Sequence, residues 1–194
     1  MKKILVLLTI GLFLTLNHGC KSQSTALSGP TKTFNLMGKS VSFVTPSAPW
    51  VESVQTIGEE DADLGMPADT VVGITFRVKG KGGLIAVGAL GQQKDKDGNF
   101  IELENDQETL DQIANWVVKR DGERLNEEYI KVLGVNAFHM TFEVGEADQR
   151  EKGEQVHFTK DGTHYTLSIL VPAQDYDAEV GQFRNLVASF KTND

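Results

Sequence analysis

The sequence predicts an α+β fold in which an antiparallel sheet is flanked by helices. Three observations predict it: apolar and polar residues alternate in many short segments, glycine-containing turns separate these segments, and only two segments have helical periodicity. About 160 residues remain after the amino-terminal region, which is the length of one ordinary domain. We therefore expect a single domain over residues 33–194, in which strands dominate and two helices cover them.

The first half of this domain is predicted to consist of strands. The first two form a hairpin, because apolar residues alternate with polar ones on both sides of a Gly38-Lys39 turn. The last two are separated by a glycine-rich turn at residues 80–83. The predicted strands are Thr33–Met37, Ser40–Thr45, Trp50–Thr56, Thr70–Lys79 and Leu84–Leu90.

A helix is predicted in the middle of the chain. Asn105 and Glu108 have the spacing of a capping box at its start, and Gly122 is expected to end it. Its apolar face is expected to comprise Leu110, Ile113, Trp116 and Val117. We interpret Trp116, like Trp50 in the third strand, as a packing residue rather than as part of a ligand platform.

Four strands and a closing helix follow. Asp161-Gly162 is a strong hairpin signal between the last two strands. The closing helix has apolar residues at spacings of four, three, four and three, a pattern typical of a core-facing helix rather than a partner-binding groove. The strands are Tyr129–Leu133, Val135–Val144, Gln155–Lys160 and Thr163–Val171, and the apolar helix positions are Tyr176, Val180, Phe183, Val187 and Phe190.

Segments at both ends of the domain resemble the PsbP-like superfamily. The residues that carry the resemblance are Phe34, Leu36, Ser40–Phe43, Pro46 and Trp50 near the start, and Tyr165–Ile169, Pro172-Ala173, Asp175-Tyr176, Phe183 and Leu186–Phe190 near the end. The resemblance implies an α/β/α sandwich and an accessory, non-enzymatic binding role. It assigns no functional residue, because that superfamily has no shared catalytic set to match.

The amino terminus has the features of an export signal. Lys2 and Lys3 precede an apolar run of thirteen residues, Ile4–Leu16, which is too short for a membrane-spanning helix of about 20 residues. The single cysteine of the chain, Cys20, follows Gly19, and this ending resembles a relaxed bacterial lipobox. We therefore expect a lipoprotein signal peptide at residues 1–19.

Lipidation of Cys20 would leave a membrane-anchored protein. Residues 20–32 then comprise the lipidated cysteine, carrying palmitate or a similar acyl group, and a flexible tether rich in Ser, Thr, Gly and Pro. Lys21 after the cysteine is not the aspartate that retains some lipoproteins at the inner membrane, which favours delivery to the outer membrane, and we expect the domain in the periplasm or elsewhere in the cell envelope. The alternative is ordinary cleavage after Ala26, with Ser24 at the small-residue position, which would release a soluble protein.

The charge of the chain excludes one class of partner. The net charge is −8, and removal of the signal would take away two lysines. No basic stripe is available to neutralise phosphates, so we expect no nucleic acid partner. The expected contacts are the membrane, through lipid, and another envelope protein.

No catalytic motif is visible. The chain has no Gly-x-Ser-x-Gly, no phosphate loop, no dinucleotide fingerprint and no His-Glu-x-x-His, so we assign no catalytic, cofactor-binding or metal-binding residue. Scattered carboxylates can still pair in space, which leaves an unrecognised hydrolase as one alternative.

Three histidines form the most notable polar group. The Asp161-Gly162 turn places Thr159 opposite His164 and His157 opposite Thr166, so both imidazoles point away from the apolar face of the hairpin. His139 also points away from Phe138, Met140 and Phe142. If its strand borders the hairpin, the three histidines gather near Glu143 as a zinc or copper site, and metal binding or delivery is the second alternative function.

Two acidic segments are interpreted as ordinary loops. Asp95–Asn99 begins like a calcium loop, but Phe100 and Asp106 stand where glycine and glutamate are required. Glu59–Asp63 is interpreted as a solvated acidic loop.

Overall fold

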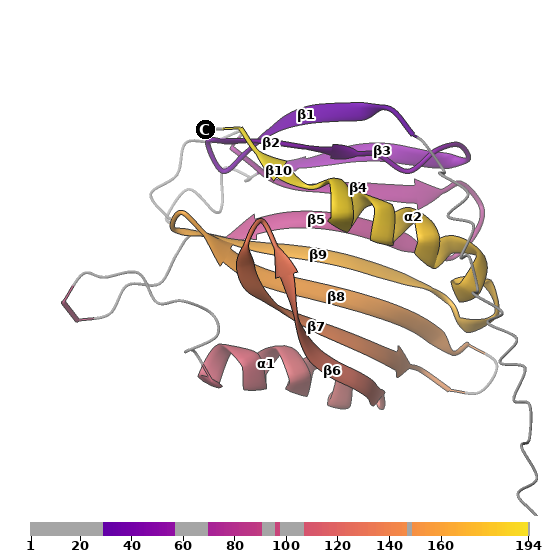
Figure 1. Cartoon of the computed structure of the whole chain (residues 1–194). Helices are drawn as coiled ribbons and strands as arrows, with labels where there is room; N and C mark the ends of the chain where they lie inside the picture. The colour runs from indigo at the N-terminus through magenta and orange to yellow at the C-terminus, as the bar shows by residue number, and fades with distance from the viewer. Residues whose placement is uncertain (1–28, 57–69, 91–95, 98–106, 147–148, 194) are drawn as a thin grey trace, which may run out of the picture.

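A seven-stranded antiparallel sheet forms the centre of the described chain (Figure 1). The computed structural model describes residues 29–56, 70–90, 96–97, 107–146 and 149–193. Within them the strand order is β3-β4-β5-β9-β8-β7-β6. These strands are β3 (Trp50–Thr56), β4 (Val71–Val78), β5 (Leu84–Leu90), β6 (Glu123–Val132), β7 (Val135–Val144), β8 (Glu151–Lys160) and β9 (Thr163–Pro172).

A smaller sheet and a helix cover one face of the large sheet. The small sheet has the order β1-β2-β10, with β1 (Thr31–Leu36), β2 (Lys39–Val44) and β10 (Lys191–Thr192). Helix α2 (Tyr176–Ser189) follows a short 3-10 turn, Ala173–Asp175. Phe183 and Leu186 of α2 join Phe43 of β2 and Phe158 of β8 in the main hydrophobic core, and all four are fully buried.

Helix α1 (Gln107–Val118) covers the opposite face. Leu110 and Val117 pack with Phe138, Met140 and Phe142 of β7 in a second apolar cluster. Ala137 of the same strand belongs to the main core, and successive strand residues point to opposite faces. The two helices therefore lie on opposite sides of the sheet, and the predicted α+β sandwich is confirmed.

Most of the predicted elements are confirmed, and the differences have physical reasons. Trp50–Thr56 and Val135–Val144 are strands with the predicted bounds. The first hairpin turn is one residue earlier than expected, because Leu36 pairs with Lys39 and the left-handed positions are Met37 and Gly38. Strands β6 and β8 start earlier than predicted, at Glu123 and Glu151, where polar residues hide the alternation.

The end of α1 also differs from the prediction. Asp121 is the residue with positive φ, 53°, and Gly122 is the next residue, whose N–H donates to the carbonyl of Val117 at 3.0 Å. A Cβ atom at Gly122 would lie 2.7 Å from that carbonyl oxygen and 2.6 Å from Val144 Cγ1. Glycine is needed here for close approach rather than for handedness. The expected cap Asn105 lies outside the described residues.

None of the helices in the described part of the chain is long and apolar enough to cross a membrane.

Candidate functional site

A buried glutamate marks the candidate site. Glu154 is on β8, paired with Thr141 of β7 and Ile169 of β9, and is 1 % exposed. It shares its face of the strand with Val156 and Phe158, so its carboxylate points towards α2. A buried carboxylate is costly unless other groups hydrogen-bond to it.

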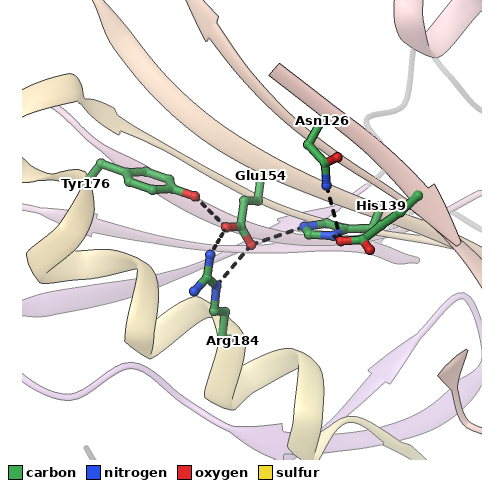
Figure 2. A network of polar contacts seen from close by, with 6 residues as sticks. Asn126, His139, Glu154, Tyr176 and Arg184 are labelled. Carbon is green, nitrogen blue, oxygen red and sulfur yellow. Dashed lines mark hydrogen bonds and ion pairs between the residues drawn. The ribbon is translucent and has the colours of Figure 1, made fainter. Parts of the chain in front are cut away.

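Three side chains satisfy this carboxylate, as Figure 2 shows. Tyr176, at the start of α2, donates its hydroxyl to Oε1. Arg184, two turns later on α2, donates from Nη2 to Oε1 and from Nε to Oε2, the latter at 3.4 Å. His139 of β7 places Nε2 3.3 Å from Oε2. The network joins α2 to two strands of the sheet.

These contacts keep Glu154 ionised. Burial alone would raise the pKa of its carboxyl, but hydrogen bonds from His139, Arg184 and Tyr176 outweigh burial and lower the pKa to about 2. Burial and the bond to Glu154 raise the pKa of Tyr176, which stays a hydroxyl donor. A carboxylate this acidic is a poor proton acceptor at neutral pH.

His139 links the network to strand β6. Its Nδ1 atom lies 3.2 Å from Oε1 of Glu128, which also accepts from Nδ2 of Asn126 at 3.3 Å. The hydrogen bond to Glu154 raises the pKa of His139, burial opposes this rise, and Glu128 adds to it. Both ring nitrogens therefore face a carboxylate.

A cavity of about 390 Å³ adjoins this network, between α2, β8 and the β6–β7 hairpin. We call it the α2 pocket. Its polar lining residues are Lys131 and four members of the network, Glu128, His139, Glu154 and Arg184. Its apolar lining residues come from the same three elements. The lining comprises Glu128, Ile130, Lys131, Val132, Leu133, His139, Glu154, Val156, Phe183, Arg184, Val187, Ala188 and Phe190.

A second, larger hollow lies elsewhere on the domain. It has a volume of about 680 Å³ and is lined by residues that are all exposed or half-buried, among them Arg120, Arg150 and Gln174. It holds no buried charged group. The α2 pocket is therefore the stronger candidate.

The predicted cluster of three histidines is wrong. The predicted hairpin register is confirmed, with Thr159 opposite His164 and His157 opposite Thr166. Strand β7 borders the hairpin, but Phe138 pairs with His157, and His139 pairs with Val156. His139 therefore faces α2 while the other two imidazoles face the side of α1. The prediction failed because the apolar residues Phe138 and Met140 of β7 face α1, whereas Phe158 of the hairpin faces the main core, so the polar faces of the two strands lie on opposite sides of the sheet.

His157 and His164 form a local pair instead. The Nδ1 atom of His157 lies 3.4 Å from Nε2 of His164 and 3.2 Å from Oγ1 of Thr166, and its Nε2 lies 3.2 Å from Oε1 of Gln155. Burial, and then the neighbouring His164, lower the pKa of His157 to about 3. A neutral ring satisfies these contacts by donating from Nε2 and accepting at Nδ1. Within the described residues no three His, Cys, Asp or Glu side chains gather as metal ligands.

The aromatic predictions are confirmed where they can be followed. Trp50 is buried and donates from Nε1 to Glu179 of α2 at 3.0 Å. The α2 stripe is buried except at Val187, which is half-buried and lines the pocket with Phe183 and Phe190. Part of the predicted core stripe therefore also forms a pocket wall.

Several predicted features lie outside the described residues. They are Cys20 and the signal, the acidic segment Glu59–Asp63, and most of Asp95–Asn99, of which only Lys96 and Asp97 are described, in a turn. The side chain of Trp116 is also outside. Lipidation of Cys20 stays a prediction.

Strand β6 presents an exposed edge. Among the described strands it pairs only with β7, and seven of its residues in succession are exposed. Leu125 is 42 % exposed and Tyr129 52 % exposed. An edge strand with exposed apolar side chains is able to pair with another chain.

Sequence reasoning missed Glu154, Tyr176 and Arg184 as a group. Tyr176 was predicted only as an apolar helix position, and the strand prediction began at Gln155. One signal was available in the alternation of the strand. Glu154, Val156 and Phe158 are two residues apart and share one face, so a carboxylate lies on an otherwise apolar face.

Two solved structures have an architecture similar to this one. The structure matches the solution structure of cyanobacterial PsbP (CyanoP) from Synechocystis sp. PCC 6803 with a TM-score of 0.53 and 13% identity, covering 84% of this chain and 92% of that one. The chain has a PsbP-like fold. A crystal structure from Bacteroides thetaiotaomicron matches with a TM-score of 0.50 and 11% identity, covering 86% of this chain and 49% of that one. No protein-family model matches the sequence, and no curated protein matches it.

Proposed function

We propose that this protein is a lipid-anchored protein of the cell envelope whose PsbP-like domain is a non-enzymatic binding module for another envelope protein. The signal and Cys20 support the anchor, and the α2 pocket supports the binding role. The charged side chains that line the pocket lie on rigid strands and a helix rather than on loops.

The observation that carries the proposal is the ionised, fully hydrogen-bonded state of Glu154 beside an apolar cavity. Its two oxygens are occupied by Tyr176, Arg184 and His139. A hydrolase needs a carboxyl or imidazole that can exchange a proton with substrate. This network is built to hold charge in place, which suits binding.

Strand β6 is the proposed protein contact. Its exposed edge lies beside the pocket, because Glu128 and Ile130 of this strand line the cavity. A partner strand added at this edge would cover Leu125 and Tyr129, and main-chain hydrogen bonds would contribute affinity.

The test is site-specific photo-crosslinking in native membranes, followed by mass spectrometry. A photoreactive residue at Tyr129 is compared with one at Val118, an α1 residue of similar exposure, 53 %, that belongs to neither β6 nor the pocket. We expect one envelope protein to be captured from position 129 and not from 118. Equal capture from both positions, or none, would contradict β6 as the contact.

The anchor is tested separately. We expect the wild-type protein to incorporate an alkyne-labelled palmitate and to fractionate with membranes, and the Cys20→Ser variant to do neither. A Cys20→Ser variant that keeps label and membrane association would overturn the anchor while leaving the β6 contact open to its own test.

A further inference from the structure

The polar lining of the α2 pocket holds three basic side chains, Lys131, His139 and Arg184, and two acids, Glu128 and Glu154. Both acids, Glu128 and Glu154, lie within hydrogen-bond distance of His139, and Glu154 also accepts from Arg184. Lys131 is exposed and forms no ion pair within the described residues. The pocket therefore differs from the chain as a whole, whose net charge is −8.

Arg184 is held in place and still has donors to offer. A guanidinium has five N–H donors, and Glu154 takes one from Nε and one from Nη2. The side chain of Arg184 is 61 % exposed, whereas that of Glu154 is 2 % exposed. The buried carboxylate fixes the guanidinium, and three of its five N–H groups are not used by Glu154.

The rest of the pocket is apolar. Val132, Val156, Phe183 and Phe190 are buried, and Ile130, Leu133 and Val187 are half-buried beside them. A volume of about 390 Å³ falls within the range of small-molecule sites, about 300–1,000 Å³. The floor suits a hydrocarbon chain.

We propose that the α2 pocket binds a small amphipathic anion, a single aliphatic chain that ends in a carboxylate. The chain lies on the apolar floor, and the carboxylate meets Lys131 and the outer edge of Arg184. A cationic head group would be repelled by both, and a neutral one would gain only weaker hydrogen bonds from them. This inference rests on the proposed role of the pocket as a binding site.

The test uses the full-length protein in phosphatidylcholine vesicles and a dodecanoate that carries a photoreactive diazirine on its chain. Labelled peptides are located by mass spectrometry. We expect label on the β6–β7 hairpin and on α2, and competition by plain dodecanoate. Dodecanol and dodecyltrimethylammonium are expected to need at least about tenfold higher concentrations, because they lack the anion that the basic residues favour.

Two variants and one control locate the interaction. Lys131→Gln removes the unpaired charge and should weaken competition by dodecanoate about two- to fivefold, the range for an exposed ion pair. Lys119→Gln changes an exposed lysine after α1 and should have no effect. Ala188→Trp places a large side chain on an exposed position of the pocket rim and should abolish labelling, with circular dichroism as the check on folding.

The outcomes separate this inference from the proposed function. If dodecanol competes as well as dodecanoate and Lys131→Gln has no effect, the anion is wrong while the pocket remains a binding site. If no probe labels the pocket, or Ala188→Trp leaves labelling unchanged, the role of the pocket itself is wrong. Stronger competition by an apolar peptide with a free carboxyl terminus would make a protein chain end the occupant and overturn the aliphatic ligand.

Discussion

The Nε2 atom of His139 lies 3.3 Å from Oε2 of Glu154, while the other ring nitrogen faces Glu128. An ionised carboxylate only accepts hydrogen bonds, and a neutral imidazole has one N–H to give. Both contacts are hydrogen bonds only when His139 is protonated. The proton on His139 therefore ties edge strand β6 to β8 in the middle of the sheet.

We expect His139 to stabilise the fold most at low pH and to lose this contribution as the pH rises. Its pKa is raised in the folded protein, so the folded state retains the proton above pH 6.5, where the unfolded chain releases it. The unfolding free energy should decline from about pH 6.5 up to the folded pKa.

Urea unfolding between pH 6 and pH 9, with an NMR titration of the imidazole, measures this. The His139→Gln variant should lack the decline. A titration midpoint of His139 at or below 6.5 would contradict the bridging role.

His157 is expected to act with the opposite sign. The pKa of His157 is lowered to about 3 in the folded protein. Below pH 6.5 this histidine therefore binds a proton in the unfolded chain but not in the folded protein. Its contribution is complete above pH 6.5 and decreases as the pH falls towards 3. The loss at pH 5 should be about 1–2 kcal/mol, since one pKa unit corresponds to about 1.4 kcal/mol.

The measurement is the unfolding free energy at pH 7 and pH 5 for the wild type and for His157→Gln. The difference between the two pH values should be smaller in the variant. An equal difference in both proteins would show that His157 takes up its proton in the folded state.

Replacing Glu154 by Gln should destabilise the domain. The change removes the charge that three donors share and should lower the free energy of unfolding by about 2–4 kcal/mol. This cost is below the upper end for buried ion pairs, because the exposed Arg184 can turn to solvent. Chemical denaturation at pH 7 measures this cost. Glu127→Gln is the matched control, because Glu127 forms an exposed pair with Arg124 and should cost less than about 1 kcal/mol. Equal costs for the two variants would mean that the Glu154 network adds no stability.

Two glycines should respond to alanine in opposite directions. A Cβ atom at Gly153 of β8 would lie 2.4 Å from the carbonyl oxygen of Ile169 and 2.8 Å from Phe142 Cζ, so Gly153→Ala should cost about 1–3 kcal/mol or more. At Gly181 of α2 a Cβ meets nothing within 4 Å, so Gly181→Ala should stabilise by about 0.5–1 kcal/mol. Thermal unfolding of both variants decides, and a stabilised Gly153→Ala would be incompatible with the β8–β9 register.

The sequence predicted the secondary structure well where one face of an element is apolar. Strand β7 was found with the observed bounds, because its buried positions Phe138 to Val144 alternate clearly. The first part of β6 was missed, because seven exposed residues carry no alternation. The Asp161-Gly162 turn fixed the register of β8 and β9, which is a local property.

The candidate site could not be predicted in the same way. Glu154 and Arg184 are 30 residues apart and on different kinds of element. No spacing rule connects them, because their meeting depends on how α2 lies across the sheet. The histidine prediction failed for a related reason, since the relative facing of β7 and β8 is a tertiary property.

The pairing of β10 with β2 has a consequence for biosynthesis. Lys191 and Thr192 pair with Ser42 and Val41, and the ring of Phe190 stacks on that of Phe43 at 5.9 Å. The residues that pair with the amino-terminal hairpin are therefore synthesised about 150 residues after it. Because Phe190 belongs to the main core, that core is complete only after synthesis has reached the last residues of the domain.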